Sequence, residues 1–205
     1  MIAVIDYGAG NLQSVEKAFR FIGCDAEVTA DAKVLQSASA AVLPGVGAFG
    51  DAMRSMEKSS LVQPLLDFIA SGRPFLGICL GLQLLFEGSE EAPGVRGLGV
   101  LKGKILRIPK LSGLKIPHVG WNSLDIKING GIFSGLEEHP YVYFVHSYYL
   151  KAEDRGIVSS TASYGITIDA SVQRGNMFAV QFHPEKSGRT GLRMLCNFAE
   201  LAQRG

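Results

Sequence analysis

Charge of either sign is scarce in this chain, and neither sign predominates. Lysine and arginine together number 20 and aspartate and glutamate 19, which makes the formal net charge +1 at pH 7. This balance gives no electrostatic reason to expect nucleic acid or an anionic membrane surface as a partner. Long apolar runs are also missing, so we expect no membrane span. Residues 1–6 lack the basic leader and cleavage site of a signal peptide, and we predict a strand there.

Cysteine is similarly scarce. The three cysteines, Cys24, Cys79 and Cys196, are odd in number and far apart, which argues against a disulfide framework or a zinc site. We therefore expect a reducing, cytoplasmic compartment, and neither a metal nor another cofactor. With 205 residues, of which 47% are hydrophobic and 19% charged, the chain has the size and composition of one globular domain spanning residues 1–205.

Apolar runs alternate with helical patterns in the first half of the chain. The predicted strands are residues 1–6, 26–29, 40–43 and 75–78. The predicted helices, with apolar residues three or four positions apart, are residues 12–22, 51–58 and 61–71. Strands that are apolar throughout are covered by helices on both faces. The pattern predicts a doubly wound α/β fold with a mostly parallel sheet, whose ligands lie at the carboxyl ends of its strands.

The second half of the chain is rich in strands separated by turn residues. The predicted strands are residues 105–108, 141–150, 157–163, 166–173 and 177–182. Turn residues at 129–131, 164–165 and 174–176 indicate hairpins, so we expect the sheet to be mixed. A closing helix over residues 190–203 carries Cys196 on its apolar side, which predicts a core position for that cysteine.

A cysteine between two glycines follows the strand at residues 75–78. Residues 77–81, Gly-Ile-Cys-Leu-Gly, have the pattern of a nucleophile elbow, in which a strand turns sharply into a helix. The glycines allow the tight turn and the close approach of neighbouring backbone. Free N–H groups and the dipole of the following helix favour the Cys79 thiolate. The alternative is a small buried cysteine at the end of a core strand.

A histidine base with an orienting acceptor is the partner that a cysteine nucleophile needs. His183, Pro184 and Glu185 follow the predicted strand 177–182. Proline holds the backbone of His183 extended, and residues two apart in extended chain face the same side. Glu185 can then bind one imidazole nitrogen while the other faces Cys79. Alone, these residues also fit a solvated His-Pro turn, but together with the elbow they predict a Cys-His-Glu triad.

The elbow and the His-Pro-Glu unit resemble the class I, triad-type glutamine amidotransferases. Further blocks resemble one branch of that superfamily, the glutaminase subunits of imidazole glycerol phosphate synthases; they are residues 6–11, 44–49, 117–122, 143–148 and 181–187. The resemblance covers essentially the whole chain. It implies the class I amidotransferase fold and the hydrolysis of glutamine to glutamate and ammonia.

The resemblance also implies a role for each residue around the cysteine. Cys79 would attack the side-chain amide of glutamine, His183 would transfer protons, and Glu185 would fix the imidazole tautomer. Backbone N–H groups of Leu80 and of Val46 or Gly47 would form the oxyanion hole. In the family, the peptide at Val46 is thought to be misoriented until the partner binds its own ligand. Without the family resemblance, residues 44–47 would be interpreted as an ordinary loop that ends a strand.

Substrate recognition follows partly from spacing and partly from the resemblance. Gln83 lies one helical turn past Cys79 and hence on the same face. By family position, Glu91 would hold the glutamine α-amino group. Further substrate contacts would come from Gly47, His146, Ser147 and Tyr148. From the residues alone, Gln83 also fits a helix-surface amide and Glu91 a solvated acidic turn. His118 and His146 lack the spacing of metal ligands.

Ammonia must be kept from water, so the resemblance implies a synthase subunit docked over the site. The expected partner is a (β/α)₈-barrel cyclase that makes imidazole glycerol phosphate and AICAR from PRFAR in histidine biosynthesis. Asn11, Trp121 and Asn122 resemble the family's docking surface. Trp121 is the single tryptophan of the chain and suits a binding hot spot if exposed. A half-buried core tryptophan is the alternative.

Three other functions compete with a glutaminase that feeds a cyclase. The amidotransferase partner of another synthase, such as anthranilate synthase, is disfavoured by the blocks at residues 6–11, 117–122 and 143–148. A cysteine peptidase or hydrolase with the same elbow is disfavoured by Gln83 and by the His-Pro-Glu unit. An inactive binding module is disfavoured by the intact triad.

Overall fold

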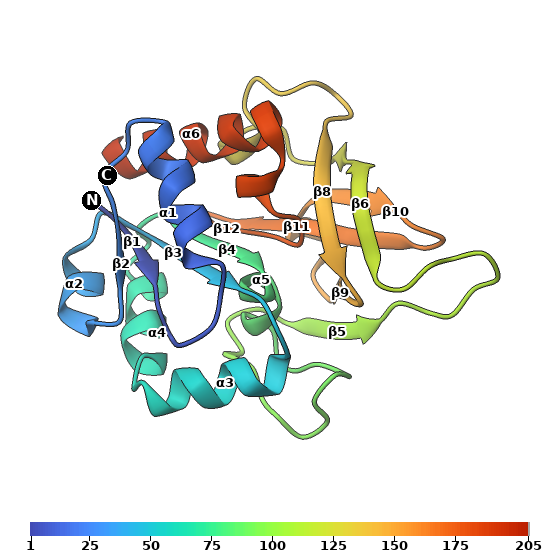
Figure 1. The fold of residues 1–205 in the computed structure, drawn as a ribbon, viewed down its shortest axis with the longest axis horizontal. Coiled ribbons are helices and arrows are strands. Elements are labelled where there is room, and N and C mark those ends of the chain that lie inside the picture. Colours follow the sequence, from blue (N-terminus) through green and yellow to red (C-terminus); the bar gives the residue numbers. More distant parts are fainter. Residues whose placement is uncertain (205) are drawn as a thin grey trace.

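A mixed sheet of ten strands runs through the computed structural model, which describes residues 1–204 (Figure 1). Its parallel half consists, in spatial order, of β2 (Ala26–Thr29), β1 (Ile2–Ile5), β3 (Ala40–Gly45), β4 (Phe75–Cys79) and β12 (Met177–Val180). Antiparallel strands extend it: β11 (Thr167–Arg174), β10 (Val158–Ser163) and β7 (Asp125–Ile126), with β9 (Tyr148–Ala152) and β5 (Gly103–Arg107) joined through β11. Beside this sheet lies an antiparallel ribbon of β6 (His118–Ser123) and β8 (Tyr141–His146).

Helices cover both faces of the parallel half (Figure 1). On one side lie α1 (Leu12–Phe21) and α6 (Gly188–Arg204), and on the other α2 (Ala32–Ser37), α3 (Phe49–Lys58) and α4 (Val62–Ala70). The remaining helical segments are α5 (Leu80–Leu84) and the 3₁₀ turns η1 (Gly131–Phe133), η2 (Arg155–Ile157) and η3 (Pro184–Lys186). Strand β1 is buried along its whole length, with Ile2 and Val4 in one apolar cluster and Ala3 and Ile5 in the other. This two-sided burial explains the unbroken apolar runs.

The predicted α/β fold with a mixed, mostly parallel sheet is confirmed, but the strand prediction 141–150 is wrong in its continuity. The segment divides at Ser147 into β8, which pairs with β6, and β9, which pairs with β5 and β11. The sequence pattern also missed β6 and α2. The helix α2 is short and is capped by Asp31, whose carboxylate accepts a hydrogen bond from the Lys33 N–H at 2.7 Å.

The carboxyl ends of three parallel strands meet at one edge of the sheet. Gly45 at the end of β3 pairs in register with Cys79 at the end of β4, and Val180 of β12 pairs with Ile78. This edge is where an α/β sheet places its ligands. Among residues 1–204, no helix combines the length and the apolar character needed to cross a membrane.

Candidate active site

Cys79 stands in a strained turn between β4 and α5. Its φ is 55° and its ψ is −108°, a backbone conformation that costs free energy in a residue with a side chain. The flanking glycines are required by close packing, since a Cβ on Gly81 would lie 1.9 Å from the Leu43 carbonyl oxygen and one on Gly77 would lie 2.9 Å from the Gly81 oxygen. The predicted nucleophile elbow is therefore present. Because α5 is only five residues long, its free N–H groups matter more at the sulfur than its dipole.

His183 is held beside this elbow by strand β8. Its N–H donates to the Tyr143 carbonyl at 2.9 Å, and its own carbonyl accepts the Ser187 hydroxyl at 2.6 Å. The Ser187 hydroxyl in turn accepts the Tyr143 N–H at 3.0 Å. These bonds tie the residues after β12 to β8 and fix the position of the buried imidazole.

Glu185 binds the imidazole as expected, although the predicted extended backbone is only partly right. His183 is extended, with φ −104° and ψ 97°, but residues 184–186 form the 3₁₀ turn η3. The tight turn, rather than a continued strand, brings Glu185 Oε1 to 2.7 Å from His183 Nδ1. Pro184 favours this turn because its fixed φ suits the first position of a helix.

The electrostatics of the pair favour a protonated imidazole. Burial lowers the pKa of His183, but its interactions with Cys79 and Glu185 outweigh that effect and raise the pKa to about 9. The Glu185 side chain is only 1% exposed, so its carboxylate is poorly screened by water. His183 Nε2 has no hydrogen-bond partner among the described residues, yet the Cys79 thiol is near enough to contribute to this pKa. The free nitrogen can therefore serve the thiol or a substrate.

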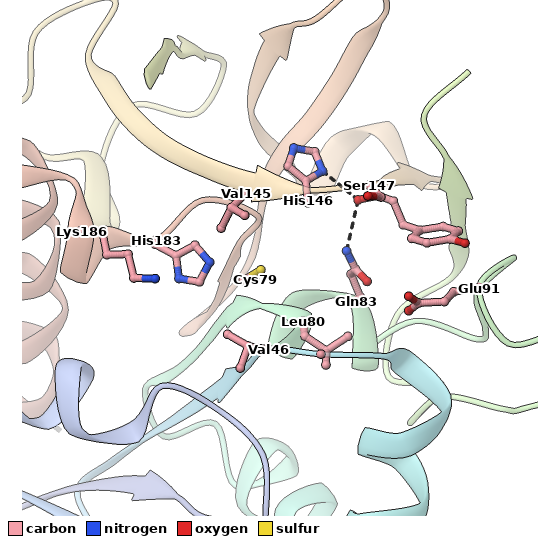
Figure 2. Close-up of a pocket in the computed structure, with 12 residues that line it drawn as sticks. Val46, Cys79, Leu80, Gln83, Glu91, Val145, His146, Ser147, His183 and Lys186 are labelled. Atoms are coloured by element: carbon pink, nitrogen blue, oxygen red, sulfur yellow. Dashed lines mark hydrogen bonds between the residues drawn. The ribbon is translucent and has the colours of Figure 1, made fainter. Parts of the chain in front are cut away.

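Cys79 and His183 line a cavity of about 420 Å³ at the carboxyl edge of the sheet (Figure 2). Its walls are formed by Val46, Gly47, Cys79, Leu80, Gln83, Glu91, Val145, His146, Ser147, Tyr148, His183 and Lys186. Every residue that the resemblance implied for the oxyanion hole and for glutamine binding is in this set. Val145 and Lys186 were missed, although both lie inside motif blocks found in the sequence.

Gln83 and Glu91 are both held in place by hydrogen bonds. Gln83 is 5% exposed, so it is not a helix-surface amide. Its Nε2 donates to the Tyr148 carbonyl at 3.2 Å and to Gln181 Oε1 at 2.9 Å. Glu91 Oε2 accepts the Phe49 N–H at the start of α3 at 2.8 Å, which fixes the carboxylate at the cavity wall rather than in a freely solvated turn.

The segment at residues 44–47 borders the cavity above the elbow. Val46 is 41% exposed, and Gly47 has a φ of 98° that favours glycine. Behind it, a Cβ on Gly45 would lie 2.6 Å from the Tyr7 hydroxyl. That hydroxyl is buried and has no hydrogen-bond partner within residues 1–204, and burial together with the nearby Cys79 raises the pKa of the Tyr7 phenol.

The residues expected at a docking surface lie around the same edge. Asn11 precedes α1, and a Cβ on the neighbouring Gly10 would lie 3.5 Å from the Pro44 carbonyl oxygen. Trp121 on β6 is 55% exposed, so it lies at the surface and is not a core tryptophan. Asn122 follows it, with its amide donating to the Ser163 carbonyl at 2.8 Å.

Metal ligation finds no support in the site. Across residues 1–204, no group of three or more His, Cys, Asp and Glu side chains is arranged to hold a metal ion. His118 and His146 instead contact each other, with 3.0 Å between His118 Nδ1 and His146 Nε2. Cys24 and Cys196 are free and half-buried, so Cys196 is less buried than predicted.

The fold and the site define an α/β enzyme of the triad amidotransferase class. The family model "Glutamine amidotransferase class-I" matches residues 3–201. Proteins called imidazole glycerol phosphate synthase subunit HisH are similar throughout: that of Geobacter metallireducens is 52% identical, covering 97% of each chain. Those of Methanothermobacter thermautotrophicus and Caldanaerobacter subterraneus are 51% and 50% identical, covering 98% of each chain.

Solved structures show the same fold at lower identity. A structure described as a glutamine amidotransferase has a TM-score of 0.77 at 19% identity and covers 99% of this chain and all of its own. A chain in the structure of PurLQS from Thermotoga maritima has a TM-score of 0.74 at 21% identity, covering 97% of both chains. The chain belongs to the class-I glutamine amidotransferase family and, within it, to the HisH subunits of imidazole glycerol phosphate synthase.

Proposed function

We propose that Cys79, His183 and Glu185 hydrolyse glutamine to glutamate and ammonia. The observation that carries this proposal is the geometry of the site: a strained cysteine beside an imidazole whose Nδ1 is 2.7 Å from a buried carboxylate. The Cys79 thiolate, whose proton is held by His183, attacks the side-chain amide carbon and forms a tetrahedral intermediate. His183 then protonates the leaving nitrogen, so that the C–N bond breaks to give ammonia and a glutamyl thioester.

Hydrolysis of the thioester restores the enzyme. His183, now neutral, takes a proton from water, whose oxygen attacks the thioester carbon. The Cys79 thiolate then leaves, and the new carboxyl group of glutamate loses its proton to solvent. Both tetrahedral intermediates carry an oxyanion, for which we propose the N–H groups of Leu80 and of Val46 or Gly47 as donors. One such donor is worth about 3–4 kcal/mol in the barrier, so the orientation of the peptide at Val46 controls the rate.

The polar groups of the cavity suit free glutamine. We assign Glu91 to the substrate α-ammonium group, because its carboxylate lines the cavity and is fixed by the Phe49 N–H. Gln83 and the segment of His146, Ser147 and Tyr148 line the same cavity. We assign to them, with Gly47, the remaining polar groups of the substrate.

The ammonia goes, we propose, to a (β/α)₈-barrel cyclase subunit that converts PRFAR to imidazole glycerol phosphate and AICAR in histidine biosynthesis. The names of the HisH relatives describe synthase subunits. The outer face of the β6–β8 ribbon supports a partner here, since Val119, Trp121 and Tyr141 on it are 55%, 55% and 61% exposed. Val119 pairs with Val145, which lines the cavity, so the apolar face continues to the site.

We propose that the cyclase contacts Asn11, Trp121 and Asn122. We also propose that the protein acts in the cytoplasm. A reducing compartment suits the free thiol of Cys79. Trp121 packs edge-on to Tyr143, with 6.1 Å between ring centroids. An exposed tryptophan supported by a half-buried tyrosine is typical of a binding hot spot.

The test compares Cys79→Ala with Cys196→Ala in the complex with the cyclase. We expect Cys79→Ala to abolish glutamine-dependent synthesis and to leave ammonia-dependent cyclisation intact. Cys196→Ala removes a thiol remote from the cavity and should retain both activities. Glutamine turnover by Cys79→Ala would show that another group is the nucleophile. If ammonia supported no cyclisation in the wild-type complex, the partner assignment would be wrong.

A further inference from the structure

A buried histidine pair connects the outer ribbon with the glutamine cavity. His118 of β6 and His146 of β8 are register partners and are 2% and 6% exposed. His118 Nδ1 lies 3.0 Å from His146 Nε2, and His146 Nδ1 lies 2.8 Å from the Tyr148 carbonyl oxygen. The His118 ring is stacked on Phe144 and on Tyr164, which holds its imidazole in a fixed plane. The proposed catalytic steps use neither ring.

The hydrogen bonds of the pair have one consistent direction. The Tyr148 carbonyl only accepts, so His146 Nδ1 carries a proton. Burial lowers the pKa of His146 to about 3 and that of His118 to about 4, so both rings are neutral. His146 Nε2 is then an acceptor, and His118 Nδ1 must donate to it. His118 Nε2 is left to accept from the Asn122 amide, whose nitrogen lies at 3.4 Å.

The same carbonyl continues this chain to the nucleophile. Gln83 Nε2 donates to the Tyr148 oxygen at 3.2 Å, and its bond meets that of His146 there (Figure 2). Gln83 also donates to Gln181 Oε1 at 2.9 Å, and Gln181 Nε2 lies 3.7 Å from the Cys79 sulfur. A carbonyl in the middle cannot pass a proton onward. The chain therefore positions groups and is not a proton wire.

We infer that His118 is a positioning residue for glutamine, because its Nδ1–H orients His146 and thereby holds the Tyr148 carbonyl and Gln83 at the cavity wall. The inference rests on the proposed glutaminase function. Both lone pairs of the Tyr148 oxygen are engaged, one by each side chain, so that this peptide cannot rotate without breaking a partly buried hydrogen bond. Loss of the His118 donor leaves His146 Nε2 unpaired and frees its ring to turn away from Tyr148.

The experiment measures glutaminase kinetics of the complex with the cyclase for variants at His118. His118→Phe keeps a flat ring in the stack but has no donor, and we expect KM for glutamine to rise about tenfold, the worth of one buried hydrogen bond, while kcat changes much less. Asparagine places its amide near the position of Nδ1 and glutamine places its amide near that of Nε2. His118→Asn should therefore restore KM to within about threefold, and His118→Gln should not.

Tyr164→Phe is the matched control. It keeps the ring that stacks on His118, 3.8 Å between centroids, and loses only the hydroxyl that donates to the Lys115 carbonyl. We expect its KM to equal that of the wild type. A KM in His118→Phe no higher than in Tyr164→Phe would overturn the inference, and so would equal KM values for the asparagine and glutamine variants.

A second measurement needs no variant to fold. Histidine ¹⁵N shifts of the wild-type chain should show both His118 and His146 neutral and protonated on Nδ1. An Nε2-protonated tautomer at either ring would refute the assigned chain. Absence of glutaminase activity in the wild-type complex would overturn the proposed function as well, whereas an active wild type with an unaltered His118→Phe would overturn the positioning role alone.

Discussion

For the replacement of Gly191 by alanine, helix propensity and tertiary packing predict opposite effects on stability. Gly191 lies in the first turns of α6, where its N–H bonds to the Ser187 carbonyl at 3.1 Å. By propensity alone, alanine should stabilise a helix here by about 1 kcal/mol. A Cβ at this position, however, would lie 1.9 Å from the Pro184 carbonyl oxygen and 2.8 Å from the Ser187 Cβ.

The distance that α6 must move to admit the new Cβ determines how much activity and stability are lost. Contacts of a Cβ below 3.0 Å are essentially never seen, so α6 and the Pro184 peptide must separate by more than about 1 Å to reach van der Waals distance. Pro184 lies between His183 and Glu185, so this shift moves both residues that we propose as triad partners of Cys79. A misplacement of about 1 Å can cost about 100-fold in rate, and overpacking typically costs about 1–3 kcal/mol in stability.

The assay is glutaminase kcat of the complex at saturating glutamine, with thermal unfolding of the same samples. We expect Gly191→Ala to lower kcat by about 100-fold and to lower the melting temperature. Thr190→Ala, the adjacent position of the same helix, gains helix propensity without the Pro184 contact and should change neither quantity much. An alanine at 191 with full kcat and a higher melting temperature would refute the packing argument.

Two further predictions concern charge. Because the pKa of His183 is raised from 6.5 to about 9, its contribution to stability is complete below about pH 6.5 and lost as pH rises through about 9. Glutaminase activity should fall over the same alkaline range. Glu185→Gln should move this alkaline fall in activity to lower pH. Asp169, 4% exposed, accepts Arg155 at 2.8 Å and the Ala152 N–H at 2.9 Å. Asp169→Ala should lower the free energy of unfolding by about 1–3 kcal/mol in denaturant titrations, without altering KM for glutamine, and a loss below about 0.5 kcal/mol would contradict this.

The parallel half of the sheet and the elbow follow from local pattern. The strands at residues 1–6, 40–43 and 75–78 are apolar almost throughout because helices cover both their faces, and this leaves a direct trace in the sequence. The elbow is equally local, since its turn, its nucleophile and its two glycines lie within five consecutive positions, residues 77–81. His183 and Glu185 are also adjacent enough for a contact to be expected, although the turn that forms it was not.

Pairing between distant segments limits what could be predicted beyond this. No local signal divides residues 141–150 at Ser147, because the break arises when β8 pairs with β6 and β9 with β5 and β11. The strand β6 was missed since Gly120 and the polar ends of His118–Ser123 weaken its alternation. The Tyr7 hydroxyl and the Gln181 amide likewise gain their places near Cys79 only through packing.

By itself, the sequence determined the α/β class, the proposed nucleophile with its proposed histidine and glutamate partners, and through its motif blocks the resemblance to glutaminase subunits. These depend on hydrophobic periodicity and on residues close together in the chain. Only the tertiary structure decided that His118 meets His146, that their chain of hydrogen bonds ends at Cys79, and that Gly191 must lack a side chain. Such contacts join residues far apart in sequence, and their energies depend on distances and burial that no local pattern encodes.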